Sequence, residues 1–345
     1  MPTDFEFNKG FTSHIIKSVD GLNLHAREYG QANDKLPIVC LAGLTRNSID
    51  FHALALYFAK LDRRIISLDS RGRGKSDYDP DWQHYNLAVE LNDALTMMAS
   101  LNVTKAVFVG TSRGGMMTML LASVKPDMIA GAVLNDIGPV LEVEGLRRIQ
   151  GYVGQMVVPA SYDEAIKILK FISNGQFSGL SEDEWQYFVR TTWAEENIEL
   201  SMSATERPSS REESKKLKVR YDLSIAKSIQ TIDLTKPVPD MWAQFEALKH
   251  VPVLSLRGEN SDLFSVATQQ QMTRRHPACA TYTVSGQAHA PLLADEPSLA
   301  RIAEFVEKVD VDNWQIQKVT AGIAAADRGE LAANEDIAAF LTKST

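Results

Sequence analysis

The chain has 345 residues, of which 44% are hydrophobic and 23% charged, and its formal net charge is −8. This composition is that of a globular protein, and the length allows one large α/β domain with an insertion, or two domains. The negative charge disfavours nucleic acid and anionic membranes as partners, because both attract a basic face. A small neutral substrate is compatible with this charge.

The sequence carries no segment typical of targeting or membrane insertion. Residues 1–6 do not begin a basic region followed by an apolar run, so we expect no signal peptide. No apolar run approaches the ~20 residues that a membrane-spanning helix needs. We therefore expect a cytoplasmic protein. Cys40 and Cys279 lie in strand-like runs and are predicted to be reduced core residues.

Short strand-like runs alternate with helical patterns along most of the chain. Residues 14–19 and 22–29 flank Asp20 and Gly21, a two-residue hairpin signal. Further strands are predicted at residues 37–41, 64–68, 107–109, 129–134, 251–256 and 281–284, and helices at 51–60, 87–101, 116–124 and 298–306. Such alternation predicts an α/β fold with a mostly parallel sheet that opens with an antiparallel hairpin.

The alternation is interrupted between residues 139 and 249. Helical patterns at residues 162–171 and 182–192 and a polar stretch at 205–218 predict a helical cap over the carboxyl edge of the sheet. Trp185, Phe188 and Trp193 are candidates to line an acyl pocket there. The alternative is that aromatic residues at helical spacing form the cap's own core, which is their more common role.

Residues 309–345 extend beyond the last predicted helix of the domain. Residues 319–326 and 334–341 have the pattern of two amphipathic helices, joined at residues 328–330. We expect a packing or dimerisation appendage, and hence a possible homodimer.

A Gly-x-Ser-x-Gly turn, Gly110 to Gly114, stands between the strand at 107–109 and the helix at 116–124. This is the context of a nucleophile elbow, in which the serine occupies a strained backbone conformation at a helix N-terminus. The glycines lack Cβ atoms and let strand and helix approach closely. Ser112 is therefore the predicted nucleophile.

A serine nucleophile needs a base and an acid that orients the base. His289 lies in a glycine-containing loop directly after the last predicted strand and is the predicted base. Asp262, after the strand before it, is the favoured acid, because the order Ser, Asp, His with the last two on consecutive loops is the hydrolase arrangement. Asp136, at the end of the strand at 129–134, is the alternative acid, and Glu259 is a weaker one.

The predicted oxyanion hole consists of backbone N–H groups. One belongs to Arg113, the residue after the nucleophile, and the other to Leu44, in the loop after the strand at 37–41. Since the donors are backbone groups, the side chains at these positions are expected to vary freely. The glycine-containing segment at residues 69–77 fails the spacing of phosphate-binding loops, and we predict a scaffold loop whose charges pair with one another.

Together these segments resemble the α/β-hydrolase superfamily, in its esterase, haloperoxidase-like and carbon–carbon hydrolase branch. The resemblance spans roughly residues 10–308 and rests on segments 42–44, 69–76, 110–115, 135–139, 257–262 and 286–291. It implies an eight-stranded sheet, a helical cap after the sixth strand, no metal and no organic cofactor. Ala42 stands where the superfamily usually has histidine, and the serine nucleophile argues against the dehalogenase and epoxide-hydrolase branches.

The predicted activity is hydrolysis of a carboxylic ester with a short or medium acyl chain, through an acyl-enzyme. The same residues also suit hydrolysis of a carbon–carbon bond in a vinylogous diketone, in which Arg113 or Arg46 would bind a carboxylate, or a thioesterase or lactonase. A non-catalytic ligand receptor is a further alternative, although binding alone needs no base.

Overall fold

The computed structural model describes residues 7–173, 175–197 and 215–328. Its centre is an eight-stranded sheet in the order β1-β2-β4-β3-β5-β6-β9-β10. The strands are β1 (Thr12–Lys17), β2 (Asn23–Tyr29), β3 (Ile38–Leu41), β4 (Ile65–Leu68), β5 (Ala106–Thr111), β6 (Ile129–Asn135), β9 (Val253–Gly258) and β10 (Cys279–Val284). Strand β2 runs antiparallel to both its neighbours, and the remaining pairs are parallel, which confirms the predicted sheet.

The burial of the strands explains why the sequence indicated them. Strands β3, β4, β6 and β9 are buried at every position, as expected for parallel strands covered on both faces. The edge strand β1 alternates between exposed and half-buried residues. The connection from β1 to β2 is longer than the predicted two residues, because the paired register begins at Lys17 and Asn23.

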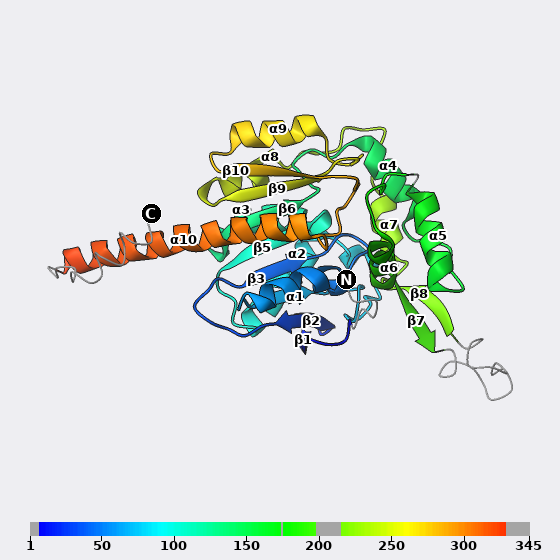
Figure 1. Cartoon of the computed structure of the whole chain (residues 1–345), viewed down its shortest axis with the longest axis horizontal. Helices are drawn as coiled ribbons and strands as arrows, with labels where there is room; N and C mark the ends of the chain where they lie inside the picture. Colours follow the sequence, from blue (N-terminus) through cyan, green and yellow to red (C-terminus); the bar gives the residue numbers. More distant parts are fainter. Residues whose placement is uncertain (1–6, 174, 198–214, 329–345) are drawn as a thin grey trace.

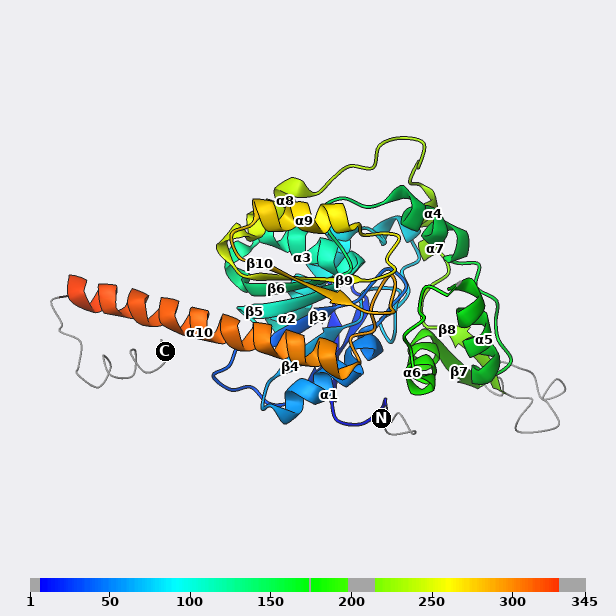
Figure 2. The same ribbon diagram turned by 45° about the horizontal axis from the view of Figure 1, so that its top comes forward.

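Helices cover both faces of the sheet (Figures 1 and 2). On one face, α1 (His52–Lys60) and α10 (Glu296–Asp327) share an apolar cluster with the strands. On the other lie α2 (Leu87–Ser100), α3 (Arg113–Val124), α8 (Trp242–Glu246) and α9 (Val266–Arg275). Short 3-10 turns occur at Ser48–Phe51, Trp82–His84, Pro126–Met128 and Ala247–His250. Among the described residues, no helix is at once long enough and apolar enough to cross a membrane.

A cap projects beyond one end of the sheet (Figure 2). It contains α4 (Val143–Tyr152), α5 (Tyr162–Ile172), α6 (Glu182–Thr192), α7 (Ile225–Gln230) and the antiparallel pair β7 (Trp193–Asn197) and β8 (Lys215–Val219). The sequence did not indicate β7 and β8, because these strands are short, charged and paired only with each other. Helix α8 packs against α3 in the main apolar core. We therefore count it with the sheet domain, which comprises the eight-stranded sheet and the helices on its two faces.

The chain after the sheet domain differs from its prediction. Helix α10 is one continuous helix of 32 residues, so residues 298–306 and 319–326 belong to the same element. Its buried residues end at Val309, and beyond that point Ile316, Val319 and Ile323 are exposed. The helix extends well past the sheet (Figure 1). The predicted helix at 334–341 lies outside the described residues.

Candidate active site

Ser112 occupies the sharp turn between β5 and α3. Its backbone has φ 51° and ψ −115°, a left-handed conformation that costs ~1–3 kcal/mol for a non-glycine residue. A Cβ on Gly110 would lie 2.6 Å from backbone atoms of Gly114, and one on Gly114 would lie 2.0 Å from the carbonyl oxygen of Leu41. The glycines of the motif are therefore required by the close approach of helix and strands.

Ser112, His289 and Asp136 form a continuous hydrogen-bonded chain. Nε2 of His289 lies 2.9 Å from Oγ of Ser112, and Nδ1 lies 2.8 Å from Oδ2 of Asp136. The Asp136 side chain is completely buried, and that of His289 is 7% exposed. The three residues come from the ends of β5 and β6 and from the loop after β10, so the parallel sheet brings together residues up to 177 positions apart.

The prediction that Asp262 orients His289 is wrong, and the alternative, Asp136, occupies that position. Asp262 instead forms an ion pair with Arg148 of the cap, with Nε–Oδ2 and Nη2–Oδ1 distances of 2.5 and 2.8 Å. Burial opposes the charge of Asp262, but the guanidinium of Arg148 holds the pKa of this carboxyl below its ordinary value. Chain order did not distinguish the two acids, because both follow strands that are adjacent in the sheet.

The loop after β9 supports Asp136 rather than supplying the acid itself. The backbone N–H of Gly258 donates to Oδ1 of Asp136 at 2.7 Å, and the hydroxyl of Ser261 donates to Oδ2 at 2.6 Å. Together with His289, these donors pair both carboxylate oxygens. Glu259, the weaker candidate, accepts hydrogen bonds from Ser285 and Gly286 and has no described contact with His289.

Leu44 and Arg113, the two predicted oxyanion residues, are linked by a buried ionic network. Nε of Arg73 donates to the carbonyl of Leu44 at 2.8 Å, and Nη1 of Arg73 donates to Glu90 at 2.8 Å. Glu90 also accepts from Nε of Arg113 at 2.7 Å. Arg73 and Glu90 are each 1% exposed. The side chain of Arg113 is therefore held in place by its ion pair with Glu90.

Residues 69–77 are predicted to pair their charges with one another, and the structure corrects this point. The charges of this loop pair mainly with residues elsewhere: Asp69 with His25, Arg71 with Asp79 and Asp93, and Arg73 with Glu90. The carboxylates hold the Arg71 pKa above its ordinary value despite burial. The segment is a scaffold loop as predicted, but it acts by connecting β2, α2 and the loop after β3.

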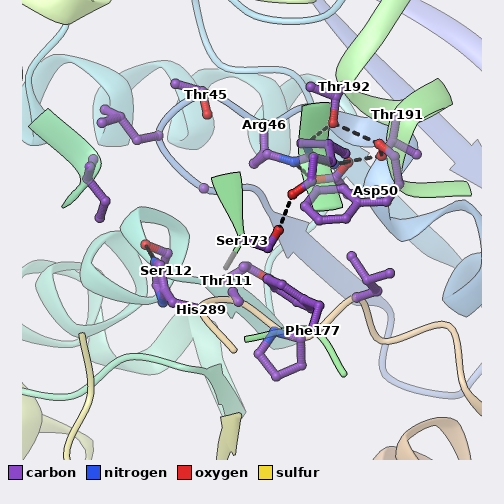
Figure 3. Close-up of a pocket in the computed structure, with 18 of the residues that line it drawn as sticks. Thr45, Arg46, Asp50, Thr111, Ser112, Ser173, Phe177, Thr191, Thr192 and His289 are labelled. Carbon is purple, nitrogen blue, oxygen red and sulfur yellow. Dashed lines mark hydrogen bonds and ion pairs between the residues drawn. The ribbon is translucent and has the colours of Figure 1, made fainter. Parts of the chain in front are cut away.

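A cavity of about 140 Å³ opens beside Ser112 and His289. Figure 3 shows these two residues on one side, and Arg46, Asp50, Thr191 and Thr192 on the other. Arg46 donates to Asp50 through Nε and Nη2, to Thr192 at 2.5 Å and to Thr191 at 2.6 Å. The loop after β3 is thereby bound to helix α6 of the cap.

Only one of the three predicted pocket aromatics reaches this cavity. Phe188 lines it, and the guanidinium carbon of Arg46 lies 5.1 Å from its ring centroid. Trp185 and Trp193 are buried in the cap's own core with Leu169 and Val189. Helical periodicity identified the aromatic residues of α6 but did not show which of them face the sheet.

The described residues include one group with the spacing of metal ligands, Asp20, Asp79 and His84. Arg71 donates to both Asp20 and Asp79, so a cation already occupies the position between them. Consequently the pKa of Asp20 falls to about 2. This donor set suits an arginine rather than a metal ion.

Sequence reasoning did not identify Arg73, Glu90 and Ser261 as parts of the site. Arg73 lies in a loop for which the sequence predicts only a scaffold role, and Glu90 lies in the predicted helix at residues 87–101, whose prediction rests on its apolar residues alone. Ser261 stands directly before the aspartate that the chain order favoured. A glutamate among the apolar positions of a buried helix is the one local signal that could have indicated an ionic network.

The comparisons agree with the fold. The model of the alpha/beta hydrolase fold family matches residues 37–296. The chain is 29% identical over 302 residues to a 3-hydroxybutyrate-oligomer hydrolase of Cupriavidus necator, covering 84% of this chain and 96% of that protein. It is 25% identical to a 2-(acetamidomethylene)succinate hydrolase of Mesorhizobium japonicum, covering 86% and 97%.

A solved structure extends this similarity. An alpha/beta hydrolase from Novosphingobium aromaticivorans superposes with a TM-score of 0.75 and 34% identity, covering 86% of this chain and 98% of that one. The sheet order, the strained serine turn and the sequence matches lead to the same assignment. The chain belongs to the alpha/beta hydrolase fold family, and the protein is a hydrolase of that family.

Proposed function

We propose that the protein hydrolyses carboxylic esters through an acyl-enzyme formed on Ser112. The observation that carries this proposal is the hydrogen-bonded chain from Ser112 through His289 to Asp136, with 2.9 and 2.8 Å separations. Two relatives support it: the 3-hydroxybutyrate-oligomer hydrolase of Cupriavidus necator, and an esterase of Escherichia coli that matches 119 residues at 33% identity.

The roles follow from the geometry. Oγ of Ser112 attacks the ester carbonyl while Nε2 of His289 accepts its proton. The buried Asp136 carboxylate holds the imidazole orientation and stabilises its positive charge. His289 then gives the proton to the leaving alcohol. Water, deprotonated by the same histidine, attacks the acyl-enzyme and releases the acid.

The negative oxygen of each tetrahedral intermediate needs hydrogen-bond donors. The N–H of Arg113 is at the first position of α3, where helix geometry leaves backbone donors without helical partners. The N–H of Leu44 is the proposed second donor, since Leu44 lines the same cavity as Ser112. One such donor is typically worth ~3–4 kcal/mol in the transition state.

The cavity supports a short or medium acyl chain that carries a polar group. A cavity of about 140 Å³ beside Ser112 is consistent with a short or medium acyl chain. The side opposite Ser112 presents Arg46, Thr191 and Thr192 beside the ring of Phe188. The hydroxyl groups of Thr191 and Thr192 donate to the carbonyl of Phe188, so their oxygens act as acceptors. A hydroxyl on the acyl chain would donate to one of these oxygens, as in an ester of a short hydroxy acid.

Hydrolysis of p-nitrophenyl esters from acetate to dodecanoate, by the wild type and by Ser112→Ala, tests the reaction. We expect turnover that is highest for short chains and is lost in the variant, whose circular dichroism stays unchanged. A matched pair, p-nitrophenyl butyrate and 3-hydroxybutyrate, tests the polar end. We expect kcat/KM to favour the hydroxy ester, and Thr192→Val to remove that preference while hydrolysis of the butyrate persists.

Absence of turnover by a folded wild-type protein over the whole series would contradict ester hydrolysis. In that case, thioesters, lactones and a vinylogous diketone would be assayed with the same serine variant. Turnover of one of these, lost in Ser112→Ala, would assign the site to that bond instead.

A further inference from the structure

A second cavity, of about 430 Å³, lies between the sheet domain and the cap, and it is lined by basic side chains. Arg27 of β2 and Lys75 line it from the sheet domain, and Arg190 of α6 and Arg220 line it from the cap. Glu195 is the one carboxylate among its lining residues. The cavity is therefore lined by four cations and one carboxylate. Its net positive charge contrasts with the net charge of −8 of the whole chain.

Arg27 is buried without an acidic partner. It is 1% exposed, and its Nη1 donates to the carbonyl of Phe7 at 2.6 Å. Its Nε is buried and has no hydrogen-bond partner in the described part of the chain. Its guanidinium carbon lies 4.3 Å from the ring centroid of Phe11. A buried guanidinium is normally also paired with a carboxylate, and Arg27 has no such partner in the described part of the chain.

The cations from the cap are not neutralised either. Arg220 donates through Nε to the carbonyls of Arg190 and Trp193, at 3.2 and 3.1 Å, and not to a carboxylate. The guanidinium of Arg190 lies 4.3 Å from the ring centroid of Tyr162. Within residues 7–173, 175–197 and 215–328, no ion pair joins a carboxylate to either arginine.

Asp69 and Asp50, two carboxylates whose charges act on Arg220, are bound to other partners. Asp69 accepts from His25 at 2.7 Å and from the backbone N–H groups of Ser48 and Lys75. Asp50 accepts from Arg46. Burial, together with the charge of Arg27, lowers the pKa of Arg220 although these acids and Tyr162 oppose the shift. Within the described part of the chain, Glu195 is therefore the one lining carboxylate that opposes this positive charge.

We infer that this cavity binds a small phosphate-type anion, held between Arg27 and Lys75 of the sheet domain and Arg190 and Arg220 of the cap. Planar guanidinium groups match the paired oxygens of phosphate, and charge-assisted hydrogen bonds to them are about twice as strong as neutral ones. A cavity of about 430 Å³ also leaves room for an organic group, so free phosphate and a phosphomonoester share the required chemistry.

Such an anion would bind the cap to the sheet domain next to the substrate cavity. Arg190 directly precedes Thr191 and Thr192, which line that cavity and accept hydrogen bonds from Arg46. Occupancy of the second cavity would therefore stabilise the position of α6. This inference concerns binding and does not depend on the proposed esterase reaction.

Isothermal titration calorimetry of the full chain with inorganic phosphate and with glycerol 3-phosphate, at ionic strength held constant with chloride, tests the inference. We expect a saturable heat with a Kd of about 1 mM or lower for at least one of the two anions. Tighter binding of glycerol 3-phosphate would identify a phosphomonoester site, and equal binding a site for the phosphate group alone. The thermal midpoint should rise with the same anion.

Single variants locate the binding. Arg27→Gln and Arg190→Gln should each raise Kd by about tenfold or more, as loss of one charge-assisted contact predicts. Arg274→Gln, at an exposed position on α9, is the matched control and should leave Kd unchanged. If Arg27→Gln does not fold, Lys75→Gln replaces it, because Lys75 is exposed.

Two results would overturn the inference. One is the absence of saturable heat up to about 10 mM of either anion, which lies well above the expected Kd. The other is binding that Arg190→Gln and Arg274→Gln weaken equally, because this would indicate general screening of surface charge.

Discussion

The hydroxyl of Ser261 donates a 2.6 Å hydrogen bond to Oδ2 of Asp136, the oxygen that also accepts from Nδ1 of His289. The oxygen of the same hydroxyl accepts from the backbone N–H groups of Leu263 and Phe264, at 3.3 and 3.1 Å. These two donors direct the hydroxyl proton toward the carboxylate. The loop after β9 thus contributes a donor, while the acid comes from the end of β6.

Replacing each aspartate separately should distinguish the two acids. Asp136→Asn is expected to lower kcat by about 10³–10⁴-fold, because the amide no longer orients His289 or stabilises its charge. Asp262→Asn removes only a partly exposed ion pair with Arg148, so kcat should change by no more than about fivefold. Steady-state kinetics on one ester measure both. A larger loss in Asp262→Asn would place the catalytic acid at the predicted position after all.

Ser261→Ala tests the support of Asp136. Loss of a hydrogen bond to a charged group, worth ~1.5–3 kcal/mol, should lower kcat by about tenfold or more with little change in KM. Ser261→Thr retains the hydroxyl and is expected to restore most of the activity. Equal activity of the alanine and threonine variants would show that the hydroxyl does not position Asp136.

Arg73→Lys tests the network that links the two proposed oxyanion donors. Lysine keeps the charge but cannot donate in a fork to Leu44 and Glu90 together. We expect kcat to fall by about 10–100-fold while KM stays nearly constant, because the donors act mainly in the transition state. Arg64→Lys, an ion-paired arginine of the sheet domain away from the site, is the control. A rise in KM alone would assign Arg73 to substrate binding.

Stability should depend on pH through His52. This side chain is 4% exposed and lies 3.0 Å from the hydroxyl of Tyr29, and burial followed by the charge of Arg27 lowers its pKa from 6.5 to about 4. The unfolded chain therefore binds a proton between pH 6.5 and 4 that the folded protein excludes. Stability falls as the pH decreases through this window.

The size of this effect follows from the same pKa difference. Between pH 7 and 5, the free energy of unfolding should fall by about 2 kcal/mol. Urea unfolding at the two pH values measures this change. His52→Gln should reduce the difference between the two pH values. His250→Gln, at an exposed position, should leave it as in the wild type. If His52→Gln and His250→Gln show the same change in unfolding free energy between pH 7 and 5, groups other than His52 cause the pH dependence.

The role of the extended helix stays a prediction. A chain that ends at Asn313 keeps the buried part of α10 and removes Ile316, Val319 and Ile323, which are exposed. Light scattering compares its mass with that of the full chain. If the extension forms a homodimer, truncation should halve the mass, whereas an unchanged oligomeric state would exclude this role.

The sequence by itself determined the elements whose signals are local. The buried apolar runs of β3 and β6, the strained turn at Ser112 and the loop that carries His289 each follow from residues close together in the chain. Glycine at 110 and 114 is required because any Cβ there would collide with neighbouring backbone. Such constraints appear directly in the order of residues.

Only the tertiary structure decided which acid reaches His289, which aromatics face the cavity and which charges meet. Asp136 and Asp262 both follow strands of the same sheet, and their roles separate because Gly258 and Ser261 bind one while Arg148 binds the other. Partners of a buried charge lie tens or hundreds of residues away, and the free energy of burying a charge depends on these distant groups. The local sequence pattern around a charged residue does not indicate which distant residues these partners are.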